Sequence, residues 1–301
     1  MRHVTLFIFV AIAGFGARAQ ATPFEPAIMP EQVEAVGHLD VDALRKTQVF
    51  TALGGQKAID AVIDGAPADL RVLARSLAGT VRGISFWHDT EHGAIYVQTR
   101  DGRGLAQLLA KAPAKRAATV DGVTTYTGGK EVDHDNDHHH GHGFFAAVGD
   151  TLVLADTADA LAQSIRVLGG HAPSLAGSSK LPATSRTGVF VFVTIGSNAL
   201  NAIQKSAHSK VLQLALKSIV ADVSESGGIV TANARAEMGS ADAVQKAKSI
   251  VDGLRALASL SGEPAQRALL DGVTVTANGL ALEVVAKLPV TELAKAIDPT
   301  H

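Results

Sequence analysis

Histidine and aspartate are concentrated in one stretch of this chain, DHDNDHHHGHG, which covers residues 133–143. Five of the twelve histidines lie within it. Neutral imidazole nitrogens and carboxylate oxygens together form a ligand set that suits divalent transition metals. The stretch therefore predicts a site for Zn²⁺, or for Ni²⁺ or Cu²⁺, with the candidate ligands Asp133, His134, Asp135, Asp137, His138, His139, His140 and His142.

The pattern of this His/Asp tract favours loose metal capture over catalysis. Gly141 and Gly143 add backbone freedom, whereas a catalytic metal needs ligands held on rigid elements by supporting hydrogen bonds. We expect weak to moderate affinity that is lost below about pH 6, because imidazole binds metal only when deprotonated. The alternative is a solvated low-complexity loop whose metal affinity has no biological use.

The residues at two required positions exclude a calcium site of the EF-hand type. The spacing of Asp133, Asp135 and Asp137 is that of the first ligands of an EF-hand loop, which needs Gly at its sixth position and Glu at its twelfth. Those positions hold His138 and Phe144.

A second, smaller group of donors lies in the sequence HDTEH, which includes His88 and His92. It falls between two strand-like runs, 80–87 and 94–100, and so predicts a hairpin turn. A helix starting at Asp101 and a single strand over 118–127 would place this turn and the tract at opposite ends of a sheet. We therefore interpret the turn as solvated and separate from the tract.

No motif of a known catalytic type is present. Gly14, Gly16 and Ala19 match a dinucleotide fingerprint only inside the N-terminal apolar run, and the pair Gly102 and Gly104 lacks the third glycine. The chain has no Cys, no Gly-x-Ser-x-Gly, no His-Glu-x-x-His and no P-loop. We predict a protein that is not an enzyme.

The N-terminus has the three parts of a secretory signal peptide. A basic start at Arg2 and an apolar run from Val4 to Gly16 precede Ala-Arg-Ala, which predicts cleavage after Ala19, with an alternative after Ala21. The run is shorter than the roughly 20 residues that span a bilayer, and no later run approaches that length. We expect a periplasmic or secreted protein without a transmembrane segment.

Composition limits the remaining classes of function and of stabilising interaction. Loss of Arg2 and Arg18 with the signal moves the net charge from −2 to about −4, which leaves no basic patch for nucleic acid. The absence of cysteine excludes disulfides, so stability must come from a core rich in Ala, Val, Leu and Ile.

The order of expected elements occurs twice. An extended leader covers 20–30, a first α+β lobe covers 31–170 and contains the His-rich loop 133–143, a Gly/Ser/Pro linker covers 171–185, and a second lobe covers 186–301. Asp271-Gly272-Val273-Thr274 repeats Asp121-Gly122-Val123-Thr124. The fold class expected is α+β, with two tandem related lobes, mostly antiparallel sheets, and helices packed on one face.

A signal peptide, a strand leading into Leu39–Leu44 and two loosely repeated lobes together resemble uncharacterised bacterial exported proteins. The resemblance implies no activity. Two hypotheses remain: a protein that buffers or delivers a Zn-like ion, and a structural module that binds an unknown envelope protein and carries the tract as decoration.

Overall fold

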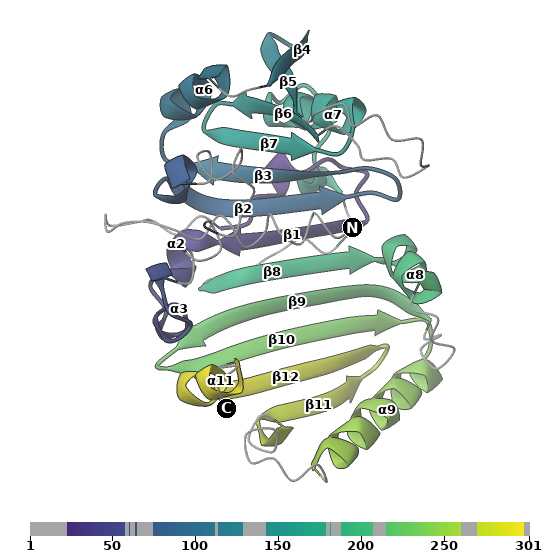
Figure 1. Ribbon diagram of the computed structural model, residues 1–301. Helices are drawn as coiled ribbons and strands as arrows, with labels where there is room; N and C mark the ends of the chain where they lie inside the picture. Colours follow the sequence, from purple (N-terminus) through teal and green to yellow (C-terminus); the bar gives the residue numbers. More distant parts are fainter. Residues whose placement is uncertain are drawn as a thin grey trace, which may run out of the picture.

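Twelve β-strands form one sheet in the computed structural model, in the order β11-β12-β10-β9-β8-β1-β2-β3-β7-β6-β5-β4 (Figure 1). The structure describes residues 23–57, 60, 64, 75–111, 114–128, 143–178, 181, 188–206, 215–259 and 270–297. The strands are β1 (Ala35–Asp40), β2 (Val81–His88), β3 (Gly93–Thr99), β4 (Lys115–Val120), β5 (Val123–Gly128), β6 (Gly143–Val148), β7 (Thr151–Ala155), β8 (Val189–Gly196), β9 (Leu216–Ser226), β10 (Ile229–Met238), β11 (Val273–Asn278) and β12 (Ala281–Pro289).

Helices connect and cover the strands. They are η1 (Pro26–Ile28), α2 (Val41–Leu44), α3 (Gln48–Ala52), α6 (Gly102–Lys111), α7 (Ala158–Leu168), η2 (Leu175–Gly177), α8 (Ser197–Ser206), α9 (Ala241–Ser259) and α11 (Val290–Ile297). Local capping explains several starts: the Asp40 side chain accepts a hydrogen bond from Ala43 N at 2.7 Å, and Thr157 caps α7 in the same way.

The expected α+β class with an antiparallel sheet is confirmed. Strands β1–β7 come from the first half of the chain and β8–β12 from the second, and every neighbouring pair is antiparallel. The halves meet where β1 pairs with β8, from Ala35 opposite Ile195 to Leu39 opposite Val191. They therefore share one continuous sheet.

Helices cover both faces of the sheet in the first half, which differs from the expectation of one covered face. One face, here called the α7 face, carries Trp87 and Tyr96 beneath Leu161 and Ile165 of α7. The other, the α6 face, carries side chains such as Val97 beneath Leu105 and Leu109 of α6. Alternation along each strand supplies apolar side chains to both faces, so the pattern alone does not say how many faces are covered.

In the second half two helix-bearing clusters lie on the α6 face. Val290 of α11 and Val49 of α3 cluster with Val223 of β9. Val223 lies on the α6 face, because it pairs with Val191 and Val191 pairs with Leu39, which is on that face. Helix α9 packs on the same face through its core cluster with Val244, Ala247, Met238 and Leu282.

The single strand expected over 118–127 is wrong. The chain reverses at Asp121 and Gly122, whose φ angles are 47° and 81°, so β4 and β5 form a hairpin. Positive φ at both central residues is typical of the type I′ turn that an Asp-Gly pair favours. The matching quartet at Asp271 lies instead at the entry to β11, where Gly272 O accepts a hydrogen bond from Lys287 N at 2.9 Å.

The leader and part of the linker pack together on the core. Phe24 and Met29 are buried, and Leu175 of η2 is buried beside them. Leu175 N donates to Met29 O at 2.8 Å, and Pro30 forms an isolated bridge with Ser174. These two segments therefore close the α7 face near the centre of the sheet.

We expect Gly37→Ala to destabilise the protein by about 1–3 kcal/mol, the usual cost of overpacking a core. Gly37 lies opposite Phe86 in the β1–β2 ladder, and a Cβ there would overlap the aromatic ring. Urea unfolding measures the change. Gly79→Ala is the control, because its Cβ would have no neighbour within 4 Å. Adding Phe86→Leu to Gly37→Ala should recover part of the loss; no recovery would contradict the proposed overlap.

Candidate functional site

The predicted metal ligands Asp133, His134, Asp135, Asp137, His138, His139, His140 and His142 lie outside the described residues. The structure does describe the two strands that bracket them. Gly128 ends β5, Gly143 begins β6, and these glycines face each other as the last pair of the β5–β6 ladder. The tract is therefore an internal connection between paired strands.

The turn that holds His88 and His92 lies at the same end of the sheet as this connection. The strand pairings show this. Phe144, the residue after Gly143, pairs with Ala155 of β7, and Ala155 also pairs with Ala94 at the start of β3. The expectation that the two loops lie at opposite ends is thus wrong. The physical reason is the reversal at the β4–β5 turn, which adds one strand and returns the chain to the end it had left.

Two aspartates hold the backbone of the β2–β3 turn through hydrogen bonds. Asp89 Oδ1 accepts from the backbone N–H groups of Glu91 at 2.7 Å and His92 at 2.6 Å, an arrangement typical of Asx turns. Asp156, at the end of β7, accepts from Gly93 N at 3.0 Å. These two aspartates fix the backbone of the turn.

The turn does not form a metal centre by itself. His92 Nε2 lies 3.9 Å from Glu91 Oε2. Across the part of the chain that the structure describes, no group of three or more His, Asp or Glu side chains is placed to hold an ion. Thr90 and Glu91 at the tip of the turn are exposed, and His88 and His92 are half-buried.

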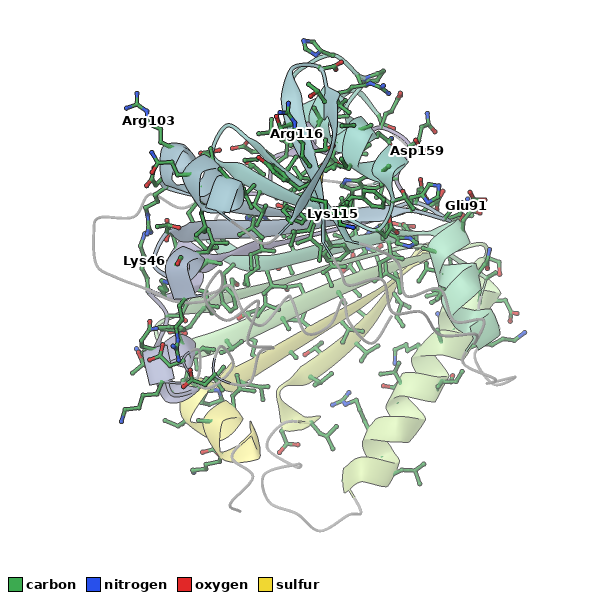
Figure 2. All side chains as sticks on the ribbon, turned by 45° about the horizontal axis from the view of Figure 1, so that its top comes forward. Lys46, Glu91, Arg103, Lys115, Arg116 and Asp159 are labelled. Carbon is green, nitrogen blue, oxygen red and sulfur yellow. The ribbon has the colours of Figure 1, made fainter. Side chains whose placement is uncertain are left out.

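Two basic side chains lie beside the end of β5, from which the chain continues toward the tract. Lys115 pairs with Thr127 and Arg116 with Tyr126, and both cations are exposed on the edge strand β4 (Figure 2). Exposed charges of this kind interact by about 0–1 kcal/mol. They can adjust the affinity of a neighbouring acidic loop but cannot build a site. Sequence reasoning missed their placement because the strand was expected to begin at Ala118.

The first half also contains a buried serine–histidine pair. His38 Nδ1 lies 2.8 Å from Ser85 Oγ, and the ring of Phe24 packs against the imidazole at 6.1 Å between centroids. Ser85 is only 1% exposed. A substrate cannot reach its hydroxyl, so the pair stabilises the centre of the sheet and does not supply a nucleophile.

A second buried polar group joins α7 to the sheet. Trp87 Nε1 donates to Tyr96 Oη at 2.9 Å and to Ser164 Oγ at 3.3 Å. Burial raises the pKa of Tyr96 to about 12, although the hydrogen bonds with Ser164 and Trp87 lower it. The phenol therefore stays neutral in the folded protein at pH values where an exposed tyrosine ionises.

This pKa shift predicts a loss of stability in alkali. An unfolded tyrosine ionises near pH 10, so between pH 10 and about 12 the unfolded chain releases a proton that the folded chain retains. Unfolding is then favoured by about 1.4 kcal/mol per pH unit, or about 2.7 kcal/mol in total. Urea unfolding from pH 9 to 12 should show this loss in the wild type and a smaller one in Tyr96→Phe. Equal losses in the two proteins would contradict the assignment.

Comparison with known proteins shows the fold alone. No family model and no curated protein matches the chain. The fold is that of TP0453. Its crystal form III gives a TM-score of 0.53 at 11% identity, covering 92% of this chain and 99% of that chain, and crystal form IV gives 0.52 at 10% identity, covering 93% and 98%. The likeness to TP0453 thus extends over nearly the whole of both chains.

Among the described residues, no helix is long and apolar enough to cross a membrane.

Proposed function

We propose that this is an exported, non-enzymatic protein that binds a divalent transition metal of the Zn²⁺ type through the tract 133–142, for buffering or delivery. The observation that carries the proposal is the pairing of Gly128 with Gly143, which makes the tract an internal loop of the sheet. A metal bound there is coupled to the folded body.

Geometry supports capture of one ion by several of these side chains. Opposite residues in an antiparallel ladder have Cα atoms about 4.5–5.5 Å apart, and fourteen residues connect the two glycines. Fully extended, a connection of that length would span roughly 45–50 Å, far more than the distance between its ends. A chain with ends this close can bring several of its five histidines to one ion.

Zinc is expected to stabilise the folded protein, because the paired ends of the connection favour binding in the native state. A contiguous histidine tract also binds zinc when the chain is unfolded, so at free zinc of 100 times Kd the gain is at most about 2.7 kcal/mol. Thermal unfolding of the mature chain should show this gain at pH 7.5, and it should fade below about pH 6 as the imidazoles protonate. Chelator competition on the same protein gives the affinity.

The matched variant replaces residues 133–142 with Gly and Ser at equal length, which keeps the connection and removes the donors. It should lose both the zinc affinity and the thermal shift. His88→Gln combined with His92→Gln is the control, and it should bind zinc like the wild type. Equal zinc affinity in the wild type and the tract variant would overturn the proposal.

The second candidate is an envelope module that binds a partner protein and carries the tract as decoration. What favours it is the exposure of edge strand β4, on which Lys115 to Thr119 are exposed and the outer side carries no strand of the described chain. Cross-linking in the native envelope tests it. A partner captured equally by the wild type and the tract variant would favour this candidate over metal handling.

We further propose that lobes 31–170 and 186–301 descend from one repeated unit. The strand order β1-β2-β3-β7-β6 in the first half has a counterpart in β8-β9-β10-β12-β11 in the second, and this supports the proposal. On this alignment the β4–β5 hairpin and the tract are additions to the first lobe. The Asp-Gly-Val-Thr match falls on β5 and β11, which are not counterparts.

A further inference from the structure

We draw no further inference here: the strongest candidate, the apolar sheet face formed by Val191, Val193, Ile219, Ala221, Ala234 and Val284 across β8, β9, β10 and β12, is only half-buried, and nothing in the part of the chain that the structure describes shows what covers it.

Discussion

Asp42→Asn is expected to reduce the free energy of unfolding by about 3–5 kcal/mol, the usual cost of removing one partner from a buried ion pair. The Asp42 side chain is 2% exposed and contacts the guanidinium groups of both Arg45, at 3.3 Å, and Arg100. Burial lowers the pKa of Arg45, Asp42 opposes this shift, and the charge of Arg100 adds to it. Without the carboxylate, two cations would face each other with no counter-charge.

The two arginines also hold the start of β2 in place. Losing their contact with Asp42 would therefore weaken the packing of this strand as well as the ion pair. Arg45 donates to Val81 O at 2.8 Å and to Ala78 O at 3.1 Å. Urea unfolding followed by circular dichroism measures the change. Asp242→Asn is the matched control, because its ion pair with Lys246 is exposed and should contribute at most about 1 kcal/mol. A loss at Asp42 no larger than at Asp242 would contradict this account.

Residues 188–301 expressed without the first half are expected not to fold. The fragment would lose the β1–β8 ladder, and this would expose the apolar strand β8 as a new sheet edge. It would also lose α3, a first-half helix whose Val49 packs with Val230 and Val290. Glu225 of β9 holds the start of this helix, accepting from Gln48 N at 3.0 Å and Val49 N at 2.8 Å.

Circular dichroism and thermal unfolding test this expectation. We expect no cooperative transition for the fragment alone, and recovery of one transition when residues 23–178 are co-expressed with it. A fragment that unfolds cooperatively by itself would show that the halves are independent domains.

Sequence patterns predicted the elements that local chemistry determines. The hairpin expected around residues 80–100 is confirmed as β2 and β3, because alternating β-prone residues flank a polar turn. The β4–β5 reversal was missed although Asp121 and Gly122 form a common hairpin signal. The same four residue types at Asp271–Thr274 lead into β11 without a reversal, so the quartet by itself does not predict a turn.

The parts of the structure that depend on register could not be predicted. Trp87 and Ser164 are far apart in sequence, and they meet only because α7 lies on one particular face of the sheet. The position of the tract relative to the β2–β3 turn likewise depends on the number of strands between them. Composition alone identified the tract, whereas its attachment to paired strands required the structure.

The position of β1 has a consequence for the order in which the sheet can form. This strand is the first of the sheet in sequence, yet it lies at the centre of the sheet, where Ala35 pairs with Ile195. Its second neighbour, β8, is therefore synthesised only after the whole first half of the chain. Such long-range pairing forms slowly and leaves apolar strands exposed in the meantime. We infer that the centre of the sheet stays incomplete until β8 has been synthesised.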